Sequence, residues 1–525
     1  MDLFLQPEDM SSPPSTPPYR PLQRQRSSYI VDSGGNNESI LDKVRLDYMS
    51  KVKSTFQHLT FQQRHLFLTE ILGCCDNQLL QYIYTFITPK LKIDFLKELP
   101  IELSLYVLSF IDDPRTLARA SHVSSHWNSL LKDEGAWKAL CLKHHYRQNI
   151  NANRYHHRHT ISYRDFFRRE YNIDTAWNQG GKITMCDNQI GDGLATSLQM
   201  DDTFIVIGCD NNHIEVFDSK SGKYIRSLLG HEGGVWAIQF IKKENNHHIL
   251  VTGGCDRVAR VWNLTTGELL FVLRGHVSTI RCLKVRDNKI AVTGSRDTTL
   301  RIWDIETGEL RHVCSGHQSS VRCLDISGNK FASGSYDTTA RLWDIDTGEC
   351  LHEFIGHHSQ IYAIAYNGNK VVTGSLDSNI RIWCPQTGDC LATLQGHTSL
   401  VGHLQLSNNL LVSGGSDGCL RVWDMETYEC KHRISAHDNS VTCIQCDDKR
   451  IVSGGSDGKV KLWNIETGTL IRSFTAAART VWKIQLNDTK AVVILQRDQQ
   501  VLENTHTASH HTVIELHDFD NIDSF

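Results

Sequence analysis

The pattern of apolar and polar residues changes at about residue 183. Before that point, apolar residues recur at helical spacing, as Ile40, Val44, Tyr48 and Val52 do. After it, short apolar runs of strand length alternate with turns that contain Gly and Asp. The pattern therefore predicts an N-terminal helical part that is followed by an all-β part.

The first and last segments of the helical part lack strong motifs. Residues 39–90 hold three short amphipathic stretches, which make a thin core alone and need a partner, either the next segment or another copy. Residues 147–182 are predicted to form a polar, helical connector. Its cluster of His156, His157 and His159 has no Cys or carboxylate at a fitting spacing, so a solvated histidine run is favoured over a metal site.

Residues 94–146 form the first unit with a recognisable pattern. Asp113 followed by Pro114 is typical of a helix start, because the carboxylate caps free N–H groups and proline fits the first turn. The apolar face of the preceding helix contains Leu103 and Val107. The opening Leu-Pro pair, this helix and a late tryptophan together resemble an F-box.

The β part repeats itself roughly every 40 residues. Each unit carries a linker His, a turn Asp and a Trp followed by a polar residue, as His276, Asp297 and Trp303 do. This set resembles WD40 repeats, and each unit should make a four-stranded propeller blade. Inside a blade these residues tie a turn to a strand, so none of them is predicted to be catalytic.

The number of repeats defines the predicted fold. Eight units can be counted, six strong and two degenerate, and degenerate ends are usual where a ring closes. The last unit lacks the Trp mark, so seven blades is the alternative. The predicted fold class is α plus all-β, with an N-terminal helical segment and F-box helices joined to an eight-bladed WD40 β-propeller over residues 183–525.

Two positions differ among the repeats and are therefore free to bind a ligand. Both lie at the same end of a blade, because the chain runs down one strand and up the next between them. Five residues after the linker His, the strong units carry Trp236, Arg281, Arg322, Tyr362, Gly402 and Thr442. Just before the turn Asp, they carry Cys255, Arg296, Tyr336, Leu376, Ser416 and Ser456.

This comparison predicts a cationic pocket with aromatic walls. Guanidinium groups bind phosphate through paired, charge-assisted hydrogen bonds, each worth about 1.5–3 kcal/mol net. One alternative is that each arginine pairs with an acid on the blade surface. Another is nucleic-acid phosphate, which a small patch without a basic stripe disfavours. The predicted phosphopeptide-binding residues are Arg281, Arg296, Arg322, Tyr336, Trp236, Ser278 and Thr279.

The order of helical segment, F-box, connector and propeller resembles the F-box/WD-repeat substrate receptors of SCF-type (cullin-RING) ubiquitin ligases. The strings GHVSTIRC and SGSYDTTARLWDIDTGEC resemble the archipelago type, which recognises phosphorylated Ser/Thr-Pro motifs. The resemblance implies that the arginines hold the phosphate, that Tyr336 supports the pocket, and that Trp236 packs against the proline after the phospho-residue.

The same resemblance implies partners for the helical part. The F-box would bind a Skp1-like adaptor and through it a cullin-RING complex, and residues 39–90 would form a homodimer. Phosphorylated substrate proteins would bind to the propeller. The residues implied in adaptor binding are Leu99, Pro100, Leu103, Val107 and Leu108.

Composition narrows the remaining function classes. The chain has 525 residues, a formal net charge of -4 and no run of about 18 apolar residues, so neither a membrane nor direct nucleic-acid binding is expected. The 16 cysteines lie mostly in strand-like segments and indicate a reducing compartment. We expect the protein in the nucleus and the cytoplasm, with a disordered Pro/Ser-rich tail over residues 1–38.

No nucleophile–base pair, metal set or phosphate-binding Gly loop is found in the sequence. We therefore expect a non-catalytic receptor subunit that needs no cofactor. The alternative function is a WD40 scaffold that acts outside ubiquitination.

Overall fold

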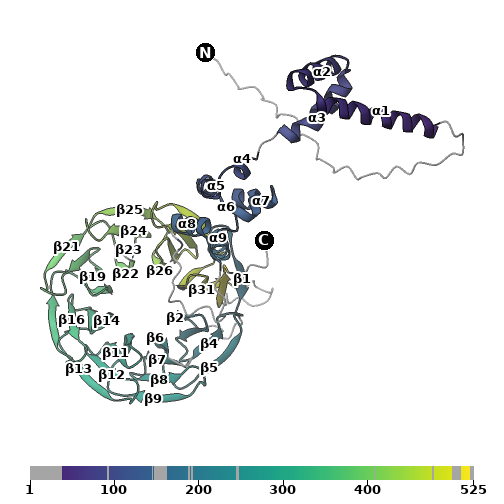
Figure 1. Ribbon diagram of the computed structural model, residues 1–525. Coiled ribbons are helices and arrows are strands. Elements are labelled where there is room, and N and C mark those ends of the chain that lie inside the picture. Colours follow the sequence, from purple (N-terminus) through teal and green to yellow (C-terminus); the bar gives the residue numbers. More distant parts are fainter. Residues whose placement is uncertain are drawn as a thin grey trace, which may run out of the picture. The chain divides into compact units, whose positions relative to one another are not determined.

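Figure 1 shows the computed structural model of the chain. The structure describes residues 38–91, 94–144, 146, 162–186, 190, 193–243, 247–407, 409–475, 478–498 and 510–520. Residues 1–37 of the predicted tail and the cluster His156, His157 and His159 lie outside the described residues. The described residues fall into two compact units, one within residues 1–104 and the other within residues 105–525. Among the helices that the structure describes, none is long and apolar enough to cross a membrane.

The described part of the first unit begins with three helices, α1 (Glu38–His58), α2 (Phe61–Gly73) and α3 (Asn77–Leu91). They bury little of their apolar surface. Phe61 is 83% exposed and Leu66 is 69% exposed, although both are large hydrophobic side chains. These helices therefore leave apolar surface that a partner could cover.

The F-box region consists of short helices, several of which begin directly after a residue whose side chain caps the helix. The helices are α4 (Phe95–Glu98), α5 (Ile101–Leu108), α6 (Pro114–Ala120), α7 (Ser125–Leu130) and α8 (Glu134–Lys143). The Asp113 carboxylate accepts hydrogen bonds from the backbone N–H groups of Arg115 and Thr116, at 3.2 and 3.0 Å, and so begins α6.

Helix α9 (Tyr163–Gln179) connects this region to the propeller. Its Phe167 is buried and lies 5.7 Å from the ring of Trp137 on α8. In its last turn, Trp177 stacks on Phe519, with 3.8 Å between the ring centres. The helix therefore contributes aromatic residues to two cores, one under the F-box helices and one at the edge of the propeller.

Among the described residues, eight four-stranded antiparallel sheets form a ring (Figure 1). In each sheet the four strands lie side by side, from the innermost strand at the channel to the outermost strand. The first four sheets are β2 (Ala195–Met200), β3 (Phe204–Cys209), β4 (Ile214–Asp218) and β5 (Tyr224–Leu228); β6 (Val235–Lys242), β7 (His248–Gly254), β8 (Ala259–Asn263) and β9 (Leu269–Leu273); β10 (Ile280–Arg286), β11 (Ile290–Ser295), β12 (Leu300–Asp304) and β13 (Leu310–Cys314); and β14 (Val321–Ser327), β15 (Lys330–Ser335), β16 (Ala340–Asp344) and β17 (Cys350–Phe354). The next three are β18 (Ile361–Tyr366), β19 (Val371–Ser375), β20 (Ile380–Trp383) and β21 (Cys390–Leu394); β22 (Val401–Ser407), β23 (Leu410–Gly415), β24 (Cys419–Asp424) and β25 (Cys430–Ser435); and β26 (Val441–Cys446), β27 (Arg450–Gly455), β28 (Val460–Asn464) and β29 (Leu470–Ser473).

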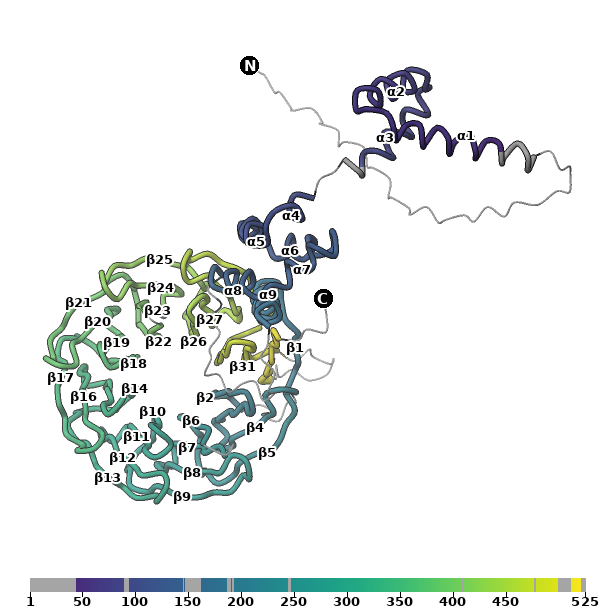
Figure 2. The backbone as a smooth tube through the Cα atoms, viewed as in Figure 1, coloured from purple at the N-terminus to yellow at the C-terminus, as the bar shows by residue number. Residues whose placement is uncertain are grey.

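The eighth sheet closes the ring by joining the two ends of the domain (Figure 2). It contains β30 (Thr480–Leu486), β31 (Lys490–Asp498), β32 (His510–Asp518) and, outermost, β1 (Lys182–Met185). Strand β1 pairs antiparallel with β32, with Lys182 opposite Asp518. The predicted fold class and its eight blades are confirmed, and the alternative of seven blades is wrong, because the degenerate last repeat borrows its fourth strand from the start of the domain.

The repeated His, Asp and Trp form a hydrogen-bonded chain inside each strong blade. In the blade of β14–β17, His317 Nδ1 lies 2.8 Å from the Asp337 carboxylate. His317 Nε2 lies 2.8 Å from Ser333 Oγ, which accepts a hydrogen bond from Trp343 Nε1 at 2.8 Å. These residues thus hold the turn to the strands, as the sequence predicts, and they are satisfied polar groups in the interior.

Candidate functional site

The first variable position is a β-bulge in every blade. The pairing of β10 with β11 passes from Ile280 directly to Cys282, so that Arg281 is the extra residue. A bulge leaves its extra residue outside the ladder and redirects the side chain. We call the eight bulged residues the rim residues. They are Thr196, Trp236, Arg281, Arg322, Tyr362, Gly402, Thr442 and Trp482.

The second variable position lies beside the rim residue of the same blade. The backbone N–H of Arg296 donates a hydrogen bond to the carbonyl of Thr279 at 2.9 Å, two residues before Arg281. The N–H of Tyr336 donates to the carbonyl of Ser320 in the same way, at 3.0 Å. The two positions therefore lie at the same end of each blade.

Aromatic rings pack against two of the three arginines. The guanidinium carbon of Arg281 lies 4.3 Å from the ring centre of Trp236, and that of Arg322 lies 5.9 Å from the ring centre of Tyr362. Tyr362 in turn contacts Tyr336, with 5.1 Å between the ring centres. The site thus combines cations with aromatic walls, and each contact joins neighbouring blades.

No described carboxylate balances the positive charges of these three arginines. Burial, and then the charge of Arg322, lower the pKa of Arg281, and Arg296 acts in the same direction. Burial and a hydrogen bond with Tyr336 raise the pKa of Tyr362, so its hydroxyl stays neutral. Within the described part of the chain, no carboxylate forms an ion pair with any of the three arginines.

Arginines elsewhere on the propeller do find carboxylates. Arg311 lies 2.5 Å from Asp304, and Arg341 lies 2.5 Å from Glu353. The alternative that Arg281, Arg296 and Arg322 form ordinary surface ion pairs therefore does not match the described residues. Their geometry leaves three guanidinium groups available to an anionic ligand.

The other predicted site residues lie around this cluster. Trp236 donates a hydrogen bond from Nε1 to Cys255 Sγ at 2.9 Å, which fixes the ring beside Arg281. The carbonyl of Ser278 accepts a hydrogen bond from Ser295 Oγ at 3.0 Å. Ser278 and Thr279 thus use their carbonyls inside the blade and are half-buried. Tyr362 was not among the predicted site residues, although it occupies the same repeat position as the arginines.

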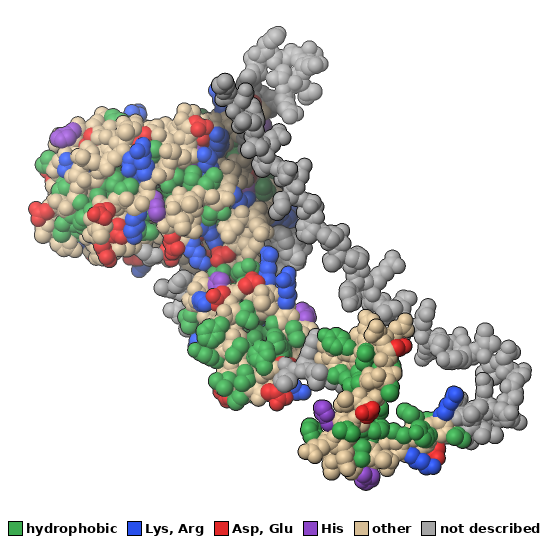
Figure 3. All heavy atoms as spheres, turned by 90° about the horizontal axis from the view of Figure 1, so that it is seen from above, with side chains coloured by type: hydrophobic (Ala, Val, Ile, Leu, Met, Phe, Trp, Pro, Cys, Tyr) green, Lys and Arg blue, Asp and Glu red, His purple; other side chains and the backbone are tan. Residues whose placement is uncertain are grey.

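The predicted adaptor-binding residues divide into two groups around helix α5. Leu103 is 50% exposed and Val107 is 38% exposed, and Pro100 is exposed as well. Leu99 is half-buried, whereas Leu108 is 2% exposed and belongs to the interior. Hydrophobic side chains gather on the surface of these helices (Figure 3). Further exposed apolar residues there are Ile101, Tyr106 and Phe110.

Comparison with known families supports the description of the F-box helices and that of the propeller. An F-box-like family model matches residues 96–143. A family model for the WD domain, G-beta repeat, matches residues 222–263, 267–304, 308–344, 348–384, 388–424 and 428–464. The chain therefore combines an F-box-like region with a WD40 propeller.

Individual relatives share parts of this arrangement. The WD repeat-containing protein pop1 of Schizosaccharomyces pombe is 32% identical over 304 residues, which are 53% of this chain and 38% of pop1. The F-box/WD repeat-containing protein 7 of Drosophila melanogaster is 34% identical over 195 residues, which are 35% of this chain and 14% of that protein. The probable E3 ubiquitin ligase complex SCF subunit sconB of Talaromyces marneffei is 27% identical over 254 residues, which are 43% of this chain and 38% of sconB.

The matched regions thus span less than half the length of these relatives. Among solved structures, the computationally designed Ika8 protein is similar, with a TM-score of 0.57 and 33% identity. The match covers 64% of this chain and 100% of that chain.

Within the described residues, no group of His, Cys, Asp and Glu is arranged to hold a metal ion.

Proposed function

We propose that this protein is the substrate-recognition subunit of an SCF-type ubiquitin ligase and that its propeller rim binds phosphorylated Ser/Thr-Pro segments. One observation carries the proposal. Arg281, Arg296 and Arg322 come together from two adjacent blades without a described carboxylate partner, on a chain with an F-box-like region. The printed names of two relatives, an F-box/WD repeat-containing protein and an SCF subunit, support it.

The geometry explains why phosphorylation would act as the switch. Arg281 is partly desolvated and faces the like charge of Arg322, so the empty site is electrostatically unfavourable. A phosphate dianion relieves this repulsion and accepts several charge-assisted hydrogen bonds. An unmodified Ser or Thr offers the arginines nothing to neutralise. Trp236 presents an apolar face on which the following proline would pack.

The protein would act by proximity and not by catalysis of its own. The F-box would bind a Skp1-like adaptor through the exposed side chains of Pro100, Leu103 and Val107, with Leu99 at the edge of this surface. Leu108 would contribute by packing α5 from inside. The adaptor and its cullin-RING complex would then hold a ubiquitin-loaded enzyme near the substrate, which raises the effective concentration of the reacting groups.

We also propose that the protein works as a homodimer through α1–α3, in the nucleus and the cytoplasm. The exposed apolar side chains of these helices, such as Phe61 and Leu66, support dimerisation because an isolated surface of this kind is unfavourable in water. Two rims in one dimer could engage two weak motifs at once.

Reconstituted ubiquitin transfer tests the proposed function. The full chain is combined with a Skp1-like adaptor and a cullin-RING complex, and a Thr-Pro substrate is supplied with and without phosphate. We expect ubiquitin transfer only to the phosphorylated substrate. A scaffold that acts outside ubiquitination would bind no adaptor and would support no transfer to either substrate.

A further inference from the structure

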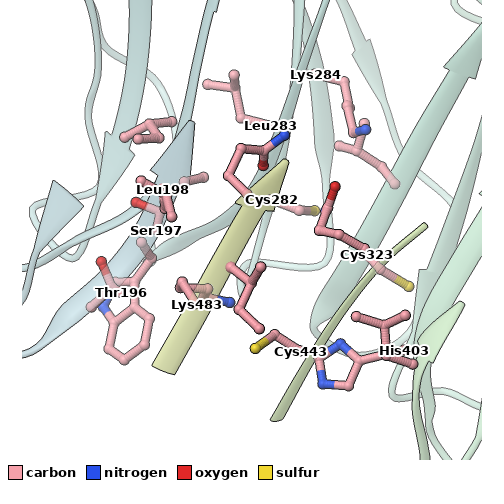
Figure 4. Close-up of a pocket in the computed structure, with 18 of the residues that line it drawn as sticks. Thr196, Ser197, Leu198, Cys282, Leu283, Lys284, Cys323, His403, Cys443 and Lys483 are labelled. Carbon is pink, nitrogen blue, oxygen red and sulfur yellow. The ribbon is translucent and has the colours of Figure 1, made fainter. Parts of the chain in front are cut away.

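A cavity in the central channel extends below the rim. Its volume is about 360 Å³, and its lining includes the rim residues Trp236 and Arg322 together with the residues that follow them on the inner strands. Figure 4 shows this space and the side chains around it. Arg322 therefore belongs to both the rim and the wall of the channel.

One charged side chain interrupts an otherwise neutral layer of this channel. The layer is formed by the residue that follows the bulge in each blade: Ser197, Ala237, Cys282, Cys323, Ala363, His403, Cys443 and Lys483. Burial, and then the charges of Lys483 and Arg322, lower the pKa of His403 to about 3, so this histidine is neutral. Lys483 is thus the single charged member of the layer, and it extends from β30 into the cavity (Figure 4).

Lys483 has no counter-charge in the described structure. No Asp or Glu is found among the described residues that line the cavity, and no described group forms an ion pair or a hydrogen bond with Lys483. The second lysine of the lining, Lys284, is paired with Asp325 at 3.2 Å. Burial lowers the pKa of Lys483, and the charge of Arg322 acts in the same direction. An unpaired cation is unfavourable at a half-buried position such as that of Lys483, and an anion would remove that cost.

We propose that Lys483 and Arg322 bind an oxyanion inside the channel, one layer below the rim site. The ligand class is a phosphate or carboxylate group, because a compact ammonium and a guanidinium both favour oxygen anions. Ser197 lies at the same layer in the adjoining blade, and its hydroxyl has no hydrogen-bond partner among the described groups, so it is a further donor for this anion.

The position of Arg322 links this site to the rim. Arg322 takes part in both sites. At the rim it holds the ligand together with Arg281 and Arg296, and in the channel an oxyanion screens the charges of Arg322 and Lys483. The oxyanion is either a second acidic group of the peptide bound at the rim or a free small anion. The inference deepens the proposed receptor function and rests on it for its biological role, but the channel site can be measured by itself.

Inorganic phosphate is the direct probe. Calorimetric titrations compare the full-length Arg296→Ala variant, in which the rim site is weakened, with the Arg296→Ala/Lys483→Met double variant. We expect phosphate binding by the first and at least about tenfold weaker binding by the second, as loss of a charge-assisted hydrogen bond implies. Arg296→Ala combined with Lys284→Met is the matched control and should bind like Arg296→Ala alone. Arg296→Ala combined with Lys483→Arg should retain binding, which separates loss of charge from loss of fold.

Peptides with one phosphate, or with one phosphate and a second acid, identify the source of the oxyanion. If Lys483→Met weakens only the peptide with the second acid, the ligand supplies the oxyanion. If it weakens phosphate binding and neither peptide, the oxyanion is a free anion. Phosphate binding that is equal with Lys or Met at position 483, or no phosphate binding by Arg296→Ala, would overturn the channel site and leave the rim proposal untouched.

Discussion

The guanidinium of Arg281 lies over the indole ring of Trp236, 4.3 Å from its centre, although the two residues belong to neighbouring blades. Both are bulged residues at the start of inner strands, β10 and β6. The ring holds the guanidinium in place but does not neutralise its charge, whereas a carboxylate would neutralise it. The arginine is thus positioned while its hydrogen-bonding groups stay available to a ligand.

This contact predicts a graded effect of Trp236 on phosphopeptide binding. Trp236→Ala should weaken the binding of a phosphorylated Thr-Pro peptide by about 2- to 30-fold, since a cation–π contact is worth about 0.5–2 kcal/mol. Trp236→Phe keeps an aromatic face and should lose less. Calorimetric titration measures both, and an affinity that is unchanged in Trp236→Ala would argue against the packing role.

The surface of helix α5 predicts which substitutions separate adaptor binding from folding. The Leu103→Ala/Val107→Ala double variant removes two exposed apolar side chains and should lose the Skp1-like adaptor in co-purification, while the thermal unfolding of the propeller stays unchanged. Leu310→Ala, at an exposed apolar position of β13, is the matched control and should keep the adaptor. Equal recovery of the adaptor with both proteins would contradict the docking surface.

The exposed helices α1–α3 predict the oligomeric state. Light scattering of the full chain should give the mass of a dimer, and removal of residues 39–90 should give a monomer of otherwise unchanged propeller structure. A narrower change, Phe61→Ser/Leu66→Ser, should shift the same equilibrium towards monomer because both side chains are exposed and apolar. A monomer mass for the unaltered chain would show that these helices have another partner.

The turn aspartates predict how stability depends on pH. Burial alone would raise the pKa of Asp337, but the hydrogen bond and charge of His317 and further hydrogen bonds lower it well below its usual range. A carboxyl with a lowered folded pKa contributes stability above its unfolded pKa of about 4 and loses it as pH falls. Urea midpoints should therefore drop below about pH 4, and less steeply in Asp337→Asn. Asp389→Asn, at an exposed outer turn, should follow the unaltered protein; an unaltered slope in Asp337→Asn would contradict this account.

The internal repeats were sufficient to predict the blades and the place of the arginines. The His, Asp and Trp marks recur because each ties a turn to a strand, so they report blade geometry directly. Positions that vary between the marks, such as Arg281 and Arg322, could then be assigned to one end of the blade. The bulge itself could not be predicted, since it depends on the pairing register of two strands and leaves no mark of its own.

The last repeat shows where this reasoning stops. The last repeat lacks both the linker His and the Trp that is followed by a polar residue in the strong units. Trp482, at a different position, and Lys483 therefore could not be aligned with the strong units before the register of β30 was known. Strand β1, four residues long, carries no repeat mark at all, and only its pairing with β32 reveals how the ring closes. Tyr362 was visible at the variable position, but its contact with Arg322 depends on the spacing of neighbouring blades.

Binding of a phosphorylated peptide to the rim tests the central claim most directly. The chain, co-purified with a Skp1-like adaptor, is titrated calorimetrically with one Thr-Pro peptide, phosphorylated and unphosphorylated. Arg322→Ala is the test variant, and Arg311→Ala, an arginine paired with Asp304, is the control. We predict binding of the phosphorylated peptide alone, lost in Arg322→Ala and kept in Arg311→Ala. Equal binding of both peptides, or phosphate-dependent binding that survives in Arg322→Ala, would contradict the account.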